Sequence, residues 1–532
     1  MSDIGTVEFV FLLLLLFIIV FGLLARRLGT PYPIVMVIGG LLLGFVPGIP
    51  TITLNPDLVF LVVLPPLLYA SAWTISWRDF RYNFISIFLL AFGLVAFTVA
   101  GVAFAAPLVF QGFDWRLGMV LGAVVAPTDA IAAASIARRV GLSGRIVDVL
   151  EGESLINDAT GLLALQIATA IVVNHTVPTI SSGILTLTWL IAGGVALGLL
   201  VGWIVDYIER QIEDGPIEIT ISIVVPYAVY LTADALHASG VLAVVTCGLF
   251  LSRRSAYFFS PRVRIQVWSF WESFTFVLNG LVFVLIGLQL PVIRASIPDY
   301  SLPTLLLSGA ILSVLLILLR LAWIYPGAAV AYFLRRKLAH QDERMPAARP
   351  IFLVGWTGMR GVVSLAAALA LPSMIATGSP FPRRNLIVFL TFCVIVVTLV
   401  LQGITLPSLI RALGLTGFSG AACEEQVARR IVIEAAVAHL ESAKERDTAE
   451  SAELYDDLTH HYRQRLASLA PDGQLEEAPD LDRYIELSRE VQRIERQTAL
   501  RLRDEGRISD QVLRRIEREL DLSESRYAIA DE

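Results

Sequence analysis

Long runs of apolar residues follow one another along the first 410 residues, and they constrain the fold more than any other feature of the chain. A helix needs about 20 apolar residues to span the hydrocarbon core of a bilayer. Of the 532 residues, 56% are hydrophobic and only 17% are charged, which is more apolar surface than a soluble domain could bury. The sequence therefore predicts an all-α polytopic membrane protein.

The apolar runs divide at charged and turn residues into about thirteen predicted transmembrane helices. Their approximate ranges are 7–24, 32–46, 56–73, 84–110, 117–137, 147–173, 186–208, 217–235, 239–252, 266–290, 303–333, 350–373 and 385–410. Two of these, 32–46 and 239–252, are short enough to be re-entrant instead. The acidic residues before the first run and the ARR after it reverse the order found in a secretory signal peptide, so we expect that run to remain as a membrane helix.

The distribution of Arg and Lys predicts the orientation of these helices. Alternate loops, beginning with the one that holds Arg26 and Arg27, carry seventeen Arg and Lys residues, whereas the opposite loops carry four. Cytoplasmic loops are enriched in Arg and Lys. We therefore expect a multi-pass protein of the cell inner (cytoplasmic) membrane, with the N-terminus outside and the C-terminal tail in the cytoplasm.

The last part of the chain differs in composition, because residues 421–532 hold 27 of the 47 acidic and 17 of the 41 basic residues. This change predicts two domains, a transmembrane domain over 1–416 and a cytoplasmic helical tail over 417–532. Helical periodicity predicts two stretches in the tail, 424–469 and 483–521, separated by PDGQLEEAPDLD. The tail is expected to stabilise a dimer or to bind a regulator.

Several classes of protein are not expected from this sequence. The three cysteines and six histidines show no metal-ligand spacing and no pattern of a disulfide framework, and the tail contains no phosphate-binding loop. We therefore expect neither an enzyme nor a bound cofactor. The bilayer is the expected partner, and nucleic acid is not.

Seven charged residues lie well within the predicted spans, away from the span ends, where each costs free energy unless it is paired or hydrated. They are Asp129, Glu153, Asp158, Asp234, Glu272, Arg320 and Arg360. Asp234 lies near a helix end, which favours exposure at the interface. Arg320 is open to two interpretations, a pair with Glu272 or a side chain that reaches the membrane surface.

Two predicted helices are interrupted in mid-membrane. Pro127 removes a main-chain donor from the fifth helix beside Asp129, and Gly355, Gly358 and Gly361 weaken the twelfth helix around Arg360. If helices 1–6 and 8–13 form two inverted repeats, each interruption lies in the fifth helix of its repeat. Such matching interruptions indicate a transporter with a binding site near the midplane, where unwound main chain lines a polar gap.

The sixth predicted helix passes beside this gap with the sequence GESLINDATG. Ser154 and Asp158 are four residues apart and share one face, and Glu153 and Asn157 form the neighbouring row. Two carboxylates here suggest two roles, one free to bind an ion or a proton and one held by a cation. Arg360 is the predicted cation. A purely structural network of Glu153, Asp158 and Arg360 is the alternative.

Six short sequence motifs, taken in their order along the chain, resemble the electroneutral branch of the monovalent cation/proton antiporters. This is the family of the NhaP-type proteins and the animal sodium/proton exchangers. APTDAIA, GESLINDATGLLAL and GMRGVVSLAAAL match best, supported by LVVLPPLLYASA, FVLNGLVFVLIGLQL and LHASGVLAVVTCGL. With the runs around them, they cover about residues 30 to 415. The resemblance implies a thirteen-helix homodimer with a core and a dimerisation domain, which exchanges Na⁺ for H⁺ in an elevator-like motion, with Li⁺ and K⁺ as alternative cations.

The resemblance also implies roles for the site residues. Asp158 would bind either Na⁺ or H⁺, and Asp129, Ser154 and the Thr128 main chain would help to coordinate the cation or to organise the crossing. Asn157 marks the electroneutral branch, whose electrogenic relatives carry a second Asp at that position.

Two further consequences follow from the resemblance. Glu153 and Arg360 would form a structural ion pair. One residue departs from the pattern, because many members have Pro where this chain has Ala130. Pro127 can still interrupt the helix, so the departure concerns the geometry of the interruption.

The mechanism expected from the residues is a competition between a hard cation and a proton for one carboxylate. With a single exchanging carboxylate, the expected stoichiometry is one for one. Three alternatives remain at this stage: K⁺ in place of Na⁺, a cation channel, and a carrier of an organic solute. A channel would need a carbonyl-lined filter, and a carrier of organic solutes would need aromatic and amide side chains near Asp158. The sequence shows neither feature, which disfavours both alternatives.

Overall fold

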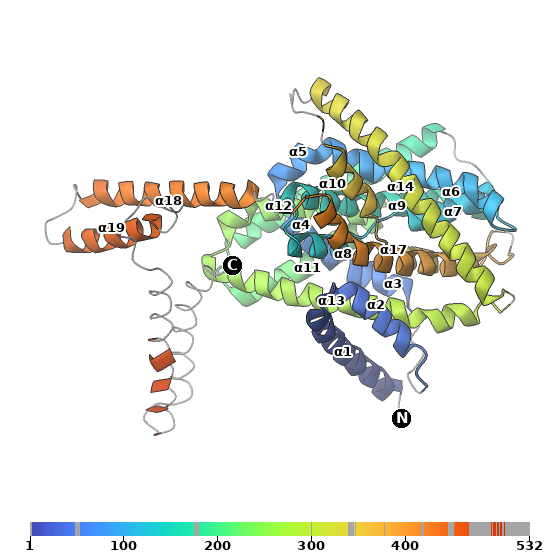
Figure 1. The fold of residues 1–532 in the computed structure, drawn as a ribbon, viewed down its shortest axis with the longest axis horizontal. Coiled ribbons are helices and arrows are strands. Elements are labelled where there is room, and N and C mark those ends of the chain that lie inside the picture. Colours follow the sequence, from blue (N-terminus) through green and yellow to red (C-terminus); the bar gives the residue numbers. More distant parts are fainter. Residues whose placement is uncertain are drawn as a thin grey trace. The chain divides into compact units, whose positions relative to one another are not determined.

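A computed structural model describes residues 3–47, 54–174, 180–298, 300–338, 345, 347–376, 378–416, 420–444 and 452–467, with a few further residues between 491 and 505. The chain divides into two compact units, Met1–Phe418 and Ser419–Glu532. Figure 1 shows that the first unit is built from packed helices. The assignment of these units to membrane and cytoplasm stays a prediction.

Helices occupy all thirteen of the predicted apolar segments. Single helices are α1 (Asp3–Leu28), α2 (Tyr32–Leu43), α9 (Gly144–Asn174), α10 (Ile180–Glu209), α11 (Gly215–Ala235), α12 (Gly240–Phe258), α13 (Pro261–Ala295), α14 (Leu302–Leu338) and α17 (Arg384–Ala412). The other segments are composite: α3 (Pro56–Leu58), η1 (Val59–Val63) and α4 (Leu64–Thr74); α5 (Trp77–Phe88), η2 (Leu89–Leu94) and α6 (Val95–Val109); α7 (Trp115–Val125) and α8 (Ala130–Arg139); α15 (Ala348–Trp356) and α16 (Val362–Leu369).

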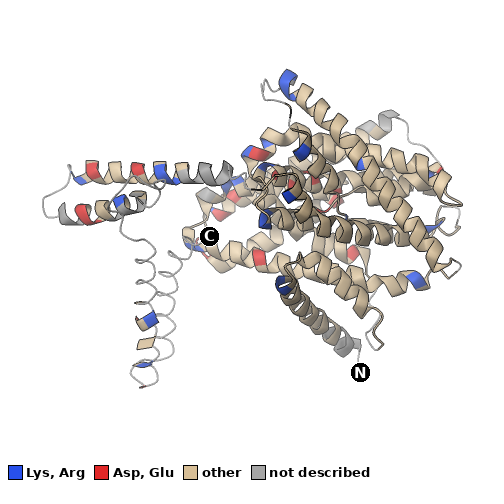
Figure 2. Cartoon of the chain, in the orientation of Figure 1, with Lys and Arg blue, Asp and Glu red and all other residues tan. Residues whose placement is uncertain are grey.

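The polytopic all-α prediction is confirmed. Ten helical spans among the described residues are long and apolar enough to cross a membrane. Figure 2 shows how sparse Lys, Arg, Asp and Glu are along the helices of the first unit. The segments that do not meet these limits contain α2, α12 and the α15–α16 pair, so a total of thirteen crossings stays a prediction.

Short polar side chains begin several of these helices. Ser76, Asp114, Asp214 and Ser239 each accept a hydrogen bond from a main-chain N–H in the first turn of α5, α7, α11 and α12. Such a cap satisfies one of the four N–H groups that a helix leaves unpaired at its start. These caps fix where each helix begins.

Both predicted interruptions are present, and the extended segments that they create cross each other. Residues 126–129 separate α7 from α8, and residues 357–361 separate α15 from α16. At the crossing, the main-chain N–H of Asp129 donates to the carbonyl of Met359 at 2.7 Å. A main-chain hydrogen bond therefore joins the two interrupted segments.

Two glycines bring α2 and α13 into main-chain contact. A Cβ atom on Gly287 would lie 2.4 Å from the carbonyl oxygen of Val37, and one on Gly40 would lie 2.3 Å from that of Val284. Small residues allow such close approach between membrane helices, where van der Waals packing replaces the hydrophobic effect as the driving force. The α2–α13 contact therefore requires glycine at both positions.

The second unit contains a helical hairpin of α18 (Gly420–Lys444) and α19 (Ala452–Ala467). Ion pairs join Arg463 to Glu441 and Lys444 to Asp456, and Ile433 is buried, as the apolar periodicity of the tail predicted. Both helices fall in the predicted helical stretch 424–469, of which residues 445–451, 468 and 469 lie outside the described residues. Most of the predicted stretch 483–521 lies outside the described residues.

Replacement of Gly287 by Ala tests the contact between α2 and α13. We expect Gly287→Ala to lower the free energy of unfolding by about 1–3 kcal/mol, because the new methyl group must push two helix backbones apart. The measurement is thermal unfolding in detergent, followed by tryptophan fluorescence. Gly183→Ala in α10 is the matched control, since its Cβ would meet nothing within 4 Å. Equal melting temperatures for the two variants would contradict the prediction.

Candidate functional site: a carboxylate cavity at the crossing

The carboxylate of Asp129 lies where two interrupted helices begin again. Its Oδ1 atom accepts a hydrogen bond from the N–H of Ile131 at 2.8 Å and so caps α8. The start of α16 is also close, since a Cβ atom on Gly361 would lie 2.1 Å from Oδ2 of Asp129. Helix N-termini carry partial positive charge, which favours a carboxylate there. Gly361 is required for this close approach.

Helix α9 supplies the other carboxylate and the hydroxyl that predicted the site. Ser154 Oγ donates to the carbonyl of Thr128 at 2.8 Å and accepts from the N–H of Ala130 at 3.2 Å, so it fastens α9 to the interrupted segment. Asp158 lies one turn further along the helix and is 8% exposed. Among the described residues, no donor forms a hydrogen bond or an ion pair with its carboxylate.

A cavity of about 100 Å³ joins these groups. Its lining comes from α4, the α7–α8 interruption, α8, α9 and the first turn of α16 together with Gly361. Thr128, Asp129, Ser154 and Asp158 are all among the lining residues. The structure therefore brings together the four residues predicted to hold a cation.

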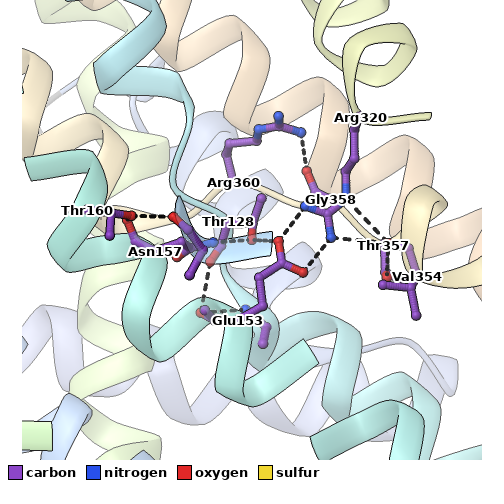
Figure 3. Close-up of polar contacts among 12 residues, drawn as sticks. Thr128, Glu153, Asn157, Thr160, Arg320, Val354, Thr357, Gly358 and Arg360 are labelled. Atoms are coloured by element: carbon purple, nitrogen blue, oxygen red, sulfur yellow. Dashed lines mark hydrogen bonds and ion pairs between the residues drawn. The ribbon is translucent and has the colours of Figure 1, made fainter. Parts of the chain in front are cut away.

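Glu153 is paired with Arg320 and not with Arg360, as Figure 3 shows. The two guanidinium nitrogens of Arg320 donate to the two carboxylate oxygens of Glu153, Nη1 to Oε1 at 2.5 Å and Nη2 to Oε2 at 2.8 Å. Arg320 also donates to the carbonyl of Val354, at 3.3 Å from Nε and 3.1 Å from Nη2. The predicted Glu153–Arg360 pair is wrong, because Arg320 is the ion-pair partner of Glu153 and the guanidinium of Arg360 donates to main-chain carbonyls instead.

Thr128 and Asn157 extend this network from Glu153 towards the cavity. The hydroxyl of Thr128 donates to Oε1 of Glu153 at 3.1 Å and accepts from Nδ2 of Asn157 at 2.7 Å. All three residues are buried (Figure 3). Asn157 therefore orients Thr128, whose hydroxyl hydrogen is used within this network. The carbonyl of Thr128 is then the better candidate to bind a cation in the cavity.

Arg360 instead interacts with main-chain carbonyls at the ends of the interrupted helices. Its Nε donates to the carbonyl of Val125, the last residue of α7, at 3.2 Å. Its Nη1 donates to the carbonyl of Gly358, just beyond α15. A guanidinium is favourable there because helix C-termini carry partial negative charge and unpaired carbonyls. Arg360 compensates the interruptions, and Arg320 compensates Glu153.

A hydrogen bond to a π-helical turn holds α9 against the segment that contains η2. The hydroxyl of Thr160, two residues after Asp158, donates at 2.6 Å to the carbonyl of Ala91 within η2. Such turns are rare and occur often at functional sites. Periodicity in the sequence gave no signal for this turn.

Two of the seven ionisable residues lie outside this arrangement. Glu272 on α13 is exposed and does not line the cavity. Asp234 is also exposed, and it lines a separate cavity of about 80 Å³ with Thr160, Gln166 and Tyr230. The predicted alternatives for Arg320 are both wrong, because its guanidinium is buried against Glu153.

The amino-acid sequence of this chain matches a known protein family over most of its length. The model of the sodium/hydrogen exchanger transmembrane family matches residues 12–412. The chain belongs to this family. As a sodium/hydrogen exchanger family member it is a multi-pass membrane transporter of cations and protons. The family resemblance of the six sequence motifs is confirmed.

Individual relatives agree over most of this exchanger's length. An uncharacterized Na⁺/H⁺ exchanger of Mycobacterium tuberculosis is 33% identical over 95% of this chain and 94% of its own. A sodium, potassium, lithium and rubidium/H⁺ antiporter of Bacillus subtilis is 30% identical over 75% of this chain and 61% of its own. The structure of the sodium proton antiporter MjNhaP1 of Methanocaldococcus jannaschii aligns with a TM-score of 0.58 at 19% identity, over 76% of this chain and 99% of that one. This last likeness confirms the antiporter fold.

A double-mutant cycle tests the assignment of Arg320. We expect Arg320→Gln to destabilise the protein by about 3–5 kcal/mol, because it leaves the carboxylate of Glu153 buried without a cation. The double variant Glu153→Gln/Arg320→Gln should recover part of this loss. Thermal unfolding in detergent measures the coupling energy, with a parallel Glu153→Gln/Arg360→Gln cycle as the comparison. A stronger coupling of Glu153 to Arg360 than to Arg320 would overturn the assignment.

Proposed function

We propose that this protein exchanges Na⁺ for H⁺ electroneutrally, one for one, at Asp158. The observation that carries the proposal is that two carboxylates on neighbouring faces of α9 have different surroundings. Glu153 has a bidentate arginine, whereas Asp158 lines the cavity and has no hydrogen-bond or ion-pair partner in the described part of the chain. A carboxylate kept unpaired near the midplane is costly unless an ion or a proton occupies it.

The cavity offers oxygen atoms that suit a hard monovalent cation, which is the transported substrate. The carboxylates of Asp158 and Asp129 would supply the charge, with Ser154 Oγ and the Thr128 carbonyl as neutral ligands. Hard cations prefer such oxygen ligands. Asn157 would act indirectly by holding Thr128 in place.

Competition at Asp158 couples the two ions. The site crosses readily when the Asp158 carboxylate carries either a cation or a proton, because both forms are nearly neutral. An empty, charged carboxylate resists passage through an occluded state because it would lose hydration without a compensating partner. Exchange then requires one ion to leave before the other enters, which gives one Na⁺ for one H⁺.

The orientation inferred from the Arg-rich loops makes the cavity inward-facing. Thr74 and Glu151 are among its lining residues. Arg138, next to a loop predicted to be cytoplasmic, pairs with Glu151 at 2.5 Å, and Arg78 in another such loop follows Thr74 by four residues. We propose a location in the cell inner membrane, with the N-terminus outside and the tail in the cytoplasm. A homodimer whose core domains move against a fixed dimerisation domain completes the proposal.

K⁺/H⁺ exchange is the second candidate. The name of the Bacillus subtilis relative includes sodium, potassium, lithium and rubidium, so cation preference varies among proteins that share this family's sequence. Selectivity between hard cations depends on cavity size and ligand placement. The same four residues would hold K⁺ in a wider arrangement.

Replacement of Asp158 by Asn tests the function directly. Purified protein in proteoliposomes should move protons when a Na⁺, Li⁺ or K⁺ gradient is imposed, and Asp158→Asn should lose at least about 90% of this flux, because an amide neither carries the charge nor exchanges the proton. The KM for the cation should rise as the pH falls, by up to roughly tenfold per unit, because one proton competes with one cation.

Controls separate the parts of the proposal. Glu272→Gln removes an exposed acid that does not line the cavity, and it should exchange at the wild-type rate. Full exchange by Asp158→Asn would sink the central assignment. A net current at zero membrane potential would exclude one-for-one stoichiometry, and the cation with the lowest KM names the preferred substrate.

A further inference from the structure

Ser364 places an unused oxygen beside the candidate ion site. It lies in the first turn of α16, three residues after Gly361, and it lines the same cavity as Asp129 and Asp158. The side chain is 1% exposed, and its Oγ atom has no hydrogen-bond partner among the described residues. The sequence did not single out this residue.

Such an isolated hydroxyl is unusual because burial without a partner costs free energy. The other two buried serines in the described part of the chain form hydrogen bonds. Ser313 on α14 is also 1% exposed, and its Oγ donates to the carbonyl of Gly309 at 2.7 Å. Ser222 on α11 donates to the carbonyl of Ile219 and accepts from the indole of Trp271. Ser364 therefore differs from equally buried serines in that its oxygen has nothing to bind in this state.

We propose that Ser364 Oγ is a further cation ligand, supplied by the second interrupted helix. The inference rests on the proposed function and deepens it. The predicted ligands Thr128, Asp129, Ser154 and Asp158 all come from α9 and the α7–α8 interruption. Ser364 would complete the site from the opposite side of the crossing, and a hydroxyl adds an oxygen without changing the charge balance of exchange.

This placement also makes Ser364 a residue that determines specificity. The attraction between a cation and a ligand oxygen grows as the distance between them falls, so each ligand contributes more to binding of a small cation than of a large one. Loss of Ser364 Oγ should therefore weaken Na⁺ and Li⁺ more than K⁺. The preference among cations should shift although both carboxylates remain.

The test compares Ser364→Ala with Ser313→Ala, which removes the same atom from an equally buried site. In proteoliposomes, Ser364→Ala should raise the KM for Na⁺ about three- to tenfold with a smaller change for K⁺, the amount expected for one lost ligand bond. Ser313→Ala should leave every KM within about twofold. Maximal flux should be retained in both variants, because neither removes the carboxylate that exchanges the proton.

Thermal unfolding in detergent supplies a second readout that does not depend on transport. Without added cation, Ser364→Ala should be as stable as the wild type or more stable, because it removes an unsatisfied buried hydroxyl. Saturating Na⁺ should raise its melting temperature less than that of the wild type, since binding to the folded state alone stabilises it. A merely structural role would instead lower stability and leave each KM unchanged.

Failure of this inference is separable from failure of the proposed function. If the wild type moves no protons under any cation gradient, the proposed function fails. If the wild type exchanges normally and Ser364→Ala keeps both its KM values and its cation-induced stabilisation, only the role of Ser364 is overturned.

Discussion

The main-chain hydrogen bond between Asp129 and Met359 is the contact on which the candidate site depends. It joins two extended segments in the middle of the first unit, where each interruption leaves main-chain groups without helical partners. These groups are tolerated only inside protein or beside a polar cavity. Arg360, the Ser154 hydroxyl and the Asp129 carboxylate satisfy several of them, so the crossing, the cavity and the proposed ion-binding groups form one connected arrangement.

The two buried arginines solve different electrostatic problems. Arg320 neutralises a full charge on Glu153 and reaches from α14 to α9. Arg360 meets partial charges at the ends of α7 and α15. This division leaves Asp158 without a cation of its own. An exchanger needs that outcome, because a permanent ion pair at Asp158 would compete with both transported ions.

Much of this arrangement could be predicted from the sequence, since its causes are local. Pro127 and the glycines around Arg360 mark the interruptions, and the spacing of Ser154 and Asp158 places them on one helix face. The partner of Glu153 could not be predicted in this way. Arg320 lies 167 residues away in an apolar run, and only tertiary packing brings its guanidinium within 2.5 Å of the carboxylate. The buried hydroxyl of Ser364, which has no hydrogen-bond partner among the described residues, was missed for the same reason.

The joint at the crossing uses main-chain atoms on both sides, and this has a consequence for how such a protein can diversify. Substitutions that keep the two segments extended change the cavity wall without removing the hydrogen bond itself. Gly361 is an exception, because a side chain there would collide with Asp129. Side chains that line the cavity can therefore change while the hydrogen bond between Asp129 and Met359 remains. Such changes offer a physical route from one cation preference to another within a single fold.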